Sequence, residues 1–192
     1  MAEIVIVVGH PRSNSYCEAL ADAYRRGAEL GGHRVRVFAL SRMRFDPILH
    51  EGFGGQQPLE PDLAEAQRSI GAANHLVIVF PLWYGCLPAL LKGFIERVFE
   101  PGFATEKAKT AMGFRPLLTG KSARVIVTMG MPGFVYRWYF GAHALKMLKR
   151  NILGFVGFSP IRDLVLGRID AVPAERRQHW LADVEALGRF AR

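Results

Sequence analysis

The sequence lacks an apolar run that approaches the roughly 20 residues of a membrane-spanning helix, so we expect no integral membrane segment. The first apolar run follows Glu3 directly, without the basic region of a signal peptide. Only two cysteines, Cys17 and Cys86, are present, too few for a disulfide framework. The histidines show no H-x-x-x-H or H-E-x-x-H spacing, and no hydrolase triad pattern occurs. We therefore expect a cytoplasmic protein without a metal.

The charge is strongly basic, with a formal net charge of +8 at pH 7. Such a chain attracts phosphorylated ligands, and it would also suit nucleic acid or an acidic membrane surface. The basic residues are scattered, as in Arg25-Arg26 and Arg176-Arg177, and do not alternate with aromatics. We therefore interpret them as solvated helix faces and expect no nucleic-acid partner.

Apolar runs and helical spacing alternate along the chain. Short apolar runs rich in β-branched residues predict strands at 4–8, 33–40, 76–80, 122–128 and 160–166. Helical spacing predicts helices at 16–30, 61–71, 88–99, 143–153 and from Pro173 to the end. This order predicts a three-layer, doubly wound α/β fold with a five-stranded parallel sheet, in the flavodoxin-like order 2-1-3-4-5. The length suits a single domain, 1–192, with long connections at about 41–60 and 101–120.

Three loops follow buried strands, at the edge where such sheets bind ligands. The loop from Pro81 to Gly85 places Trp83 and Tyr84 on a turn, which indicates a flat guest. For a Trp-Tyr pair taken alone, the alternative is packing in the interior. The loop at 128–133 contains Gly130, which allows close backbone approach to a ligand.

The first loop, at 10–15, lies between a buried strand and a helix N-terminus, a position that favours phosphate. The hydroxyls of Ser13 and Ser15 and the amide of Asn14 can donate hydrogen bonds there. The alternative is that one of the serines only caps the helix. The loop has neither the G-x-G-x-x-G pattern nor a Walker ending, so neither a Rossmann dinucleotide site nor an NTPase is supported.

Residues 80–99, FPLWYGCLPALLKGFIERVF, resemble the matching loop and helix of the flavodoxin-like NAD(P)H:quinone oxidoreductases, the DT-diaphorase group. Residues 10–20, HPRSNSYCEAL, are similar to the first flavin-phosphate loop of that family, with Cys17 where the family has Asn. The loop from Thr128 matches the family's Thr-Thr-Gly-Gly loop, although Met129 and Met131 replace a Thr and a Gly. The resemblance covers over half of the chain.

The resemblance implies that the protein binds FAD, or FMN as in shorter members, and transfers hydride from NADPH or NADH through flavin N5 to a quinone in a ping-pong cycle. It implies catalytic roles for Tyr136, which matches the family's Tyr, and His143, which lies one place from the family's His. For His143 the alternative is a surface residue at a helix start. The implied flavin-binding residues are His10, Ser13, Asn14, Ser15, Tyr16, Cys17, Pro81, Leu82, Trp83, Tyr84, Gly85, Thr128, Met129, Gly130, Met131 and Tyr136.

The resemblance also implies a homodimer with sites between the subunits. Phe103, Phe114, Trp138 and Tyr139 would line that interface, or would be covered within the monomer. The alternative function is a flavin-binding electron carrier or ancillary subunit that docks on a partner protein through the two long connections. Because carrier flavodoxins tend to be acidic, the positive charge of this chain counts against a simple carrier.

Overall fold

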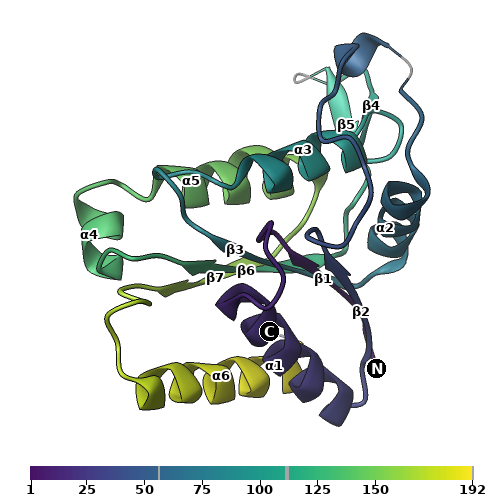
Figure 1. Cartoon of the computed structure of the whole chain (residues 1–192). Helices are drawn as coiled ribbons and strands as arrows, with labels where there is room; N and C mark the ends of the chain where they lie inside the picture. The colour runs from purple at the N-terminus through teal and green to yellow at the C-terminus, as the bar shows by residue number, and fades with distance from the viewer. Residues whose placement is uncertain (56, 111–112, 192) are drawn as a thin grey trace.

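The computed structural model describes residues 1–55, 57–110 and 113–191. A parallel sheet with the order β2-β1-β3-β6-β7 forms its centre (Figure 1). The strands are β1 (Glu3–Val8), β2 (Arg34–Ala39), β3 (His75–Pro81), β6 (Ser122–Thr128) and β7 (Ile161–Leu166). Counted along the chain, these five strands have the order 2-1-3-4-5, so the predicted flavodoxin-like topology is confirmed.

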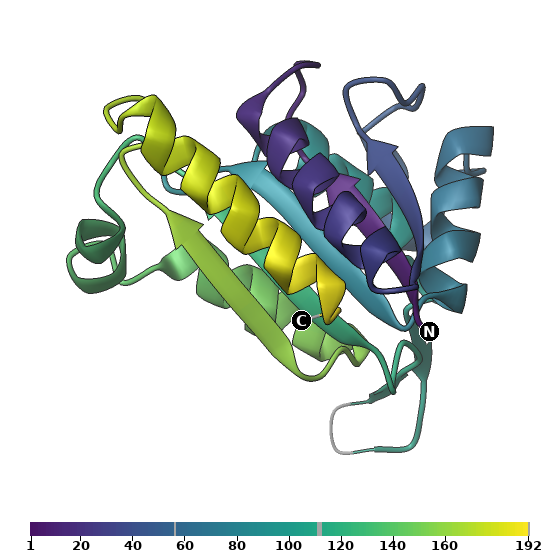
Figure 2. The same cartoon turned by 90° about the horizontal axis from the view of Figure 1, so that it is seen from below.

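Helices cover both faces of the sheet, which confirms the three layers. Helices α1 (Tyr16–Leu30) and α6 (Ala174–Arg189) cover one face, the lower one in Figure 1 and the nearer one in Figure 2. The opposite face carries α2 (Pro61–Ala72), α3 (Ala89–Val98), α5 (His143–Lys146) and the π-helix η2 (Met147–Gly154).

Burial along the strands follows from these layers. In β1, Ile4, Ile6 and Val8 pack toward α1, while Val5 and Val7 pack on the opposite face. Strand β2 lies at the sheet edge and alternates exposed arginines with partly buried valines, as its sequence predicted.

Two glycines allow α1 and α6 to approach closely. A Cβ at Gly27 would lie 1.8 Å from the Glu185 carbonyl oxygen, and a Cβ at Gly188 would lie 2.1 Å from the Tyr24 carbonyl oxygen. The first turns of both helices also lie side by side. The contact that shows this is the hydrogen bond from the Tyr16 hydroxyl to the Arg177 carbonyl, at 2.8 Å. Helix α6 is thereby brought to the same sheet edge as the first loop.

Two segments differ from the predicted elements. The connection at 101–120 contains a small antiparallel hairpin of β4 (Thr105–Lys107) and β5 (Phe114–Pro116), whose strands are too short to show alternation. The segment before the fifth strand forms a further helix, α4 (Gly133–Trp138), then α5 and η2, instead of one regular helix at 143–153. Helix α3 begins at Ala89, with Pro88 immediately before it.

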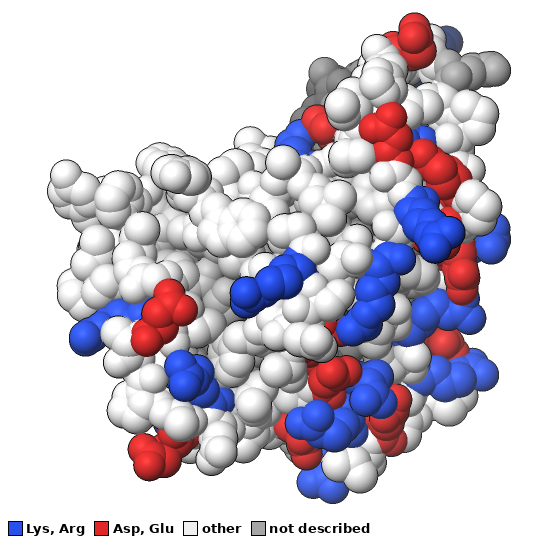
Figure 3. All heavy atoms as spheres, in the orientation of Figure 1, with Lys and Arg blue, Asp and Glu red and all other residues white. Residues whose placement is uncertain are grey.

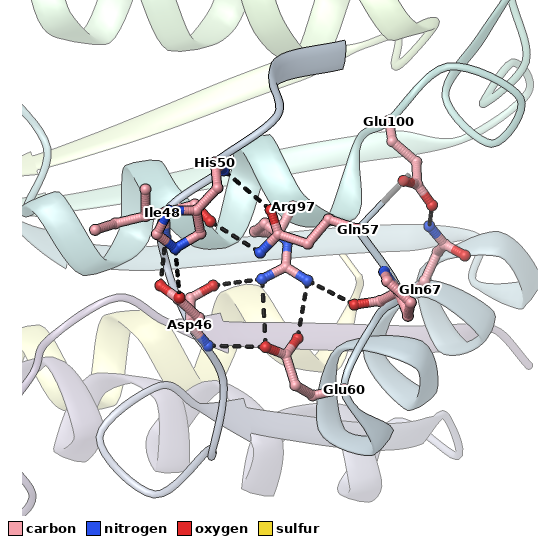
Figure 4. A network of polar contacts seen from close by, with 9 residues as sticks. Asp46, Ile48, His50, Gln57, Glu60, Gln67, Arg97 and Glu100 are labelled. Carbon is pink, nitrogen blue, oxygen red and sulfur yellow. Dashed lines mark hydrogen bonds and ion pairs between the residues drawn. The ribbon is translucent and has the colours of Figure 1, made fainter. Parts of the chain in front are cut away.

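The long connection at 41–60 is held against α3 by the buried guanidinium group of Arg97 (Figure 4). Arg97 Nη1 donates to the Asp46 carbonyl at 2.5 Å, and Nη2 donates to the Pro58 carbonyl at 2.9 Å and to Glu60 Oε2 at 3.0 Å. The loop also bonds to itself, since His50 Nε2 lies 2.8 Å from Asp46 Oδ2. This connection is therefore long but well anchored. Its only helical turn among the described residues is η1 (Gly52–Gly54).

His75, at the start of β3, gives the fold a predicted pH dependence. Burial, followed by the charge of Arg124, lowers the pKa of His75 from 6.5 to about 4. Between these values the unfolded chain is protonated at His75 and the folded protein is not. Stability is therefore full above pH 6.5 and falls as the pH drops toward 4, by about 3 kcal/mol from this residue.

Urea unfolding between pH 4 and 7 would measure this effect. Since carboxylates titrate in the same range, the comparison is with His75→Phe, which keeps a ring beside Tyr24 but cannot titrate. The variant is expected to have a shallower loss of stability at low pH. Equal slopes for the two proteins would contradict the assignment.

Among the described residues, no helix combines the length and the apolar character needed to cross a membrane.

Candidate functional site

A cleft of about 410 Å³ opens at the carboxyl ends of the strands. Its lining consists of His10, Arg12, Ser15, Tyr16, Cys17, Pro81, Leu82, Trp83, Thr128, Met129, Gly130, Ile169, Asp170 and Arg177. The loops after β1, β3 and β6 thus meet at one cavity, and the segment after β7 joins them. Another cavity, of about 440 Å³, lies between α3 and η2, away from these strand ends, and is lined mostly by apolar side chains.

His10 offers a defined hydrogen-bond donor to the cleft. Its Nδ1 accepts the backbone N–H of Arg12 at 3.0 Å, so the proton of the neutral ring lies on Nε2. Burial, and secondarily the charge of Arg12, lowers the pKa of His10 and keeps the ring neutral near pH 7. The ring also meets Trp83 edge to face, with centroids 5.4 Å apart, and so connects the first and second loops.

The three polar residues expected to bind phosphate are arranged differently from one another. Ser15 lines the cleft and also caps α1, since its Oγ accepts the Glu18 N–H at 3.3 Å. Ser13 lies outside the lining, with its hydroxyl 3.2 Å from that of Ser41. Asn14 is exposed outside the lining, and its backbone N–H donates to Glu18 Oε2 at 2.7 Å.

The second loop forms a tight turn. Trp83 and Cys86 exchange backbone hydrogen bonds of 3.0 and 2.8 Å. Tyr84 (φ 49°) and Gly85 (φ 75°) between them are both left-handed, as in a type I′ turn. Trp83 is 44% exposed and lines the cleft, while Tyr84 is fully exposed at the tip. Packing of this pair in the interior is therefore excluded.

The third loop is joined to the first by Cys17, whose Sγ lies 3.4 Å from Thr128 Oγ1. Burial raises the pKa of the Cys17 thiol to about 11, so it stays neutral and serves as a packing group. Gly130 lines the cleft with open space beside it, since a Cβ there would meet only Asp170 Oδ2, at 3.7 Å. Met131 lies outside the lining, and its carbonyl accepts the Arg168 N–H at 3.0 Å.

Tyr136 and His143 are not among the residues that line the cleft. Tyr136 is buried, and its hydroxyl oxygen accepts the Leu145 N–H at 3.1 Å. Burial raises the pKa of Tyr136. His143 is exposed at the start of α5. Gly85, at the turn of the second loop, also lies outside the lining.

Four lining residues were missing from the predicted site: Arg12, Ile169, Asp170 and Arg177. The position of β7 could have indicated Ile169 and Asp170, because the fifth strand of a parallel sheet ends at the same edge as the others. Arg177 lies in the first turn of α6, and its side chain reaches the Ile169 carbonyl at 3.4 Å. With Arg12 it places two arginine residues at the cleft, where Tyr16 also lies. Burial raises the pKa of Tyr16 to about 12.

The parallel sheet and the cleft at its carboxyl edge define a flavodoxin-like protein. Residues 2–189 match the family model Flavodoxin_2, described as a flavodoxin-like fold. The chain belongs to this family, which confirms the resemblance noted in the sequence.

Relatives and solved structures support the same family. The chain is 30% identical to NAD(P)H dehydrogenase (quinone) 1 of Cavia porcellus, over 93% of this chain and 73% of that protein. It is 31% identical to an NAD(P)H oxidoreductase of Haemophilus influenzae, over 91% of this chain and 88% of that protein. The solved NAD(P)H:quinone oxidoreductase of Methanothermobacter marburgensis is 25% identical, with a TM-score of 0.79 and coverage of 97% and 94%. These matches identify the chain as an oxidoreductase.

An FMN-dependent NADH-azoreductase from Bacillus anthracis, solved with FMN, shares the fold at 20% identity, with a TM-score of 0.76 and full coverage of both chains. Among the described residues, no group of three or more His, Cys, Asp and Glu side chains could hold a metal ion.

Proposed function

We propose that the protein is a flavin-dependent NAD(P)H oxidoreductase that reduces quinones or similar small acceptors in a ping-pong cycle. The observation that carries this proposal is the cleft, where loops from four strand ends bring aromatic, small and basic residues together. Membership of the Flavodoxin_2 family and similarity to quinone-type relatives support it.

The cleft residues suit a phosphorylated flavin. The guanidinium groups of Arg12 and Arg177 are good phosphate partners, and neutral His10 can donate from Nε2. Trp83 offers an aromatic surface for a ring, and the open space at Gly130 admits one close to the backbone. A bound flavin would supply hydride acceptance at N5 and two-electron transfer, while the protein orients the reactants and excludes water.

The remaining predicted site residues have proposed roles of two kinds. Ser15, Tyr16 and Cys17 would surround the phosphate end, and Pro81, Leu82 and Met129 would contact the ring. Tyr136 and His143 stay proposed catalytic residues. Because neither lines the cleft, a catalytic role for them requires either a bound ring that extends beyond the lining residues or a shift of the segment at 133–143 toward it.

We propose FAD as the cofactor, with FMN as the alternative, because two guanidinium groups beside one cleft suit a diphosphate. Either NADPH or NADH would be the electron donor. Chromatography of the cofactor released from purified protein would identify the flavin. The visible absorbance of the same preparation would give its occupancy.

The function is tested by reconstituting the protein with flavin and following NADPH- and NADH-dependent reduction of menadione. We expect turnover with at least one of the donors, and parallel initial-rate lines when both substrates are varied. A protein that takes up no flavin and shows no turnover would contradict the proposal.

We further propose that the enzyme is cytoplasmic.

The carrier or ancillary-subunit function remains the second candidate, because the anchored 41–60 connection exposes Ile48 and Phe53, which would serve as a docking surface. Slow reduction of the bound flavin by NAD(P)H, together with fast electron exchange with a protein partner, would favour it over the enzyme.

We also propose a homodimer, and the exposure of the four aromatic residues in the monomer supports a choice among them. Trp138 and Tyr139 are 87% and 82% exposed on or beside α4, where Figure 3 shows mostly uncharged surface. Phe103 packs within the monomer against the hydrophobic core, and Phe114 lies against Phe155, with ring centroids 4.2 Å apart. Trp138 and Tyr139 are therefore the proposed interface residues.

Light scattering at micromolar concentration is expected to give the mass of a dimer for the wild type. A double variant, Trp138→Ala with Tyr139→Ala, is expected to raise the dissociation constant of the dimer roughly tenfold or more. The reason is that large aromatic residues are among those that contribute most to binding at an interface, more than about 1 kcal/mol each. Leu30→Ala, at an apolar residue of α1 that is 66% exposed, is the control. A monomeric wild type would refute the proposal.

A further inference from the structure

We infer that Glu18 and Arg42 form a charge-compensating pair that positions the first loop for a cofactor phosphate, and that Arg42 is needed because it offsets the negative charge of Glu18. This inference rests on the proposed function and deepens it. It assigns a role to two residues that do not line the cleft.

The geometry around Glu18 ties its carboxylate to the loop. Glu18 lies in the first turn of α1, and its Oε2 accepts the Asn14 N–H at 2.7 Å. Asn14 is left-handed, with φ 56°, at the point where the loop turns into the helix. Asparagine adopts this conformation more readily than other non-glycine residues, and the hydrogen bond from its N–H to Glu18 helps to fix the turn.

The other carboxylate oxygen, Oε1, forms an ion pair with the guanidinium group of Arg42, which follows β2. The Glu18 side chain is only 13% exposed, whereas that of Arg42 is 59% exposed. A second contact, between the hydroxyls of Ser13 and Ser41 at 3.2 Å, joins the same two segments. The loop after β1 is therefore held to the segment after β2 by residues that do not line the cleft.

The charge of Glu18 opposes the proposed role of this loop. The N-terminus of a helix attracts anions, and a carboxylate there competes with the charge of a phosphate brought to the same turn. Arg42 pairs with that carboxylate directly. Without Arg42, Glu18 would leave an uncompensated negative charge beside the residues that line the phosphate end, Arg12 and Ser15.

The test is a double-mutant cycle measured with two ligands that differ in one phosphate. Flavin-free protein is titrated with FMN and with riboflavin, and quenching of flavin fluorescence gives each dissociation constant. Arg42→Met is expected to weaken FMN about tenfold, or 1.4 kcal/mol, and to change riboflavin less than about twofold. Adding Glu18→Gln to Arg42→Met is expected to restore most of the FMN affinity, because the opposing charge is then gone.

Arg25→Met is the matched control. It breaks the ion pair between Arg25 and Glu29 on the same helix, away from the first loop, and is expected to leave both affinities unchanged. Thermal unfolding of each variant shows whether it is folded at the titration temperature. If Arg42→Met does not fold, Glu18→Gln alone tests the charge, and is expected to bind FMN at least as tightly as the wild type.

Three results would overturn the inference while the proposed function stands: equal loss of FMN and riboflavin affinity, no change in either, or no recovery in the double variant. A wild type that binds neither ligand nor FAD would overturn the proposed function first, and this inference with it.

Discussion

Replacing Arg97 with methionine is expected to lower the free energy of unfolding by about 4 kcal/mol, the usual cost of removing one partner from a buried ion pair. The Arg97 side chain is 1% exposed. Its guanidinium group forms an ion pair with Glu60 and donates hydrogen bonds to two backbone carbonyls. Methionine fills part of the volume but donates no hydrogen bond. The Asp46 and Pro58 carbonyls and the Glu60 carboxylate would lose their partner, and the 41–60 connection would detach from α3.

Urea unfolding at pH 7 measures the change, and limited proteolysis shows whether cleavage moves to this connection. Arg36→Met is the control, because its ion pair with Glu65 is more than half exposed on the arginine side and is expected to contribute less than about 1 kcal/mol. If the two variants lose similar stability, Arg97 does not anchor the connection as described.

Replacing Gly130 with leucine is expected to weaken flavin binding roughly a thousandfold, or about 4 kcal/mol, while the free energy of unfolding changes by less than about 0.5 kcal/mol. The backbone of Gly130 is not left-handed, and a Cβ there meets no atom closer than 3.7 Å. A leucine side chain can therefore be accommodated in the flavin-free protein. It would occupy the space between the third loop and Asp170 that the ring is proposed to use.

Flavin titration together with urea unfolding separates the two effects. Gly54→Leu is the matched control, since a Cβ at Gly54 meets nothing within 4 Å and this residue lies outside the cleft. It is expected to bind flavin like the wild type. Normal flavin affinity in Gly130→Leu would show that the ring binds elsewhere.

Much of the fold was predictable because its signals are local. The apolar runs of β1, β3 and β6 are buried on both faces, as runs of β-branched residues predict. The helix predicted at 16–30 is α1, and Gly31 follows it. Two features have no such local signal in the sequence. One is the hairpin of β4 and β5, and the other is the break between α4 and α5 at Ala142, which is left-handed with φ 49°.

The site was predictable as a set of loops but not as a set of side chains. Position after a buried strand identified the loops that contain His10, Trp83 and Gly130, and all three residues line one cleft. The same argument could not show that Ser13 turns toward Ser41, or that Tyr136 is buried with its hydroxyl at the Leu145 N–H. These orientations depend on neighbours from other elements, which a local pattern does not contain.

The sequence by itself determined the order of the five strands of the parallel sheet, the three loops at the sheet edge and the family, because each depends on short-range periodicity or a contiguous motif. Only the tertiary structure decided which charges meet the cleft. Arg177 reaches it through the packing of α6 on α1, where the Tyr16 hydroxyl and the Arg177 carbonyl, 161 positions apart, share a hydrogen bond. Arg42 reaches Glu18 in the same way, since the parallel pairing of β1 and β2 brings their following segments together.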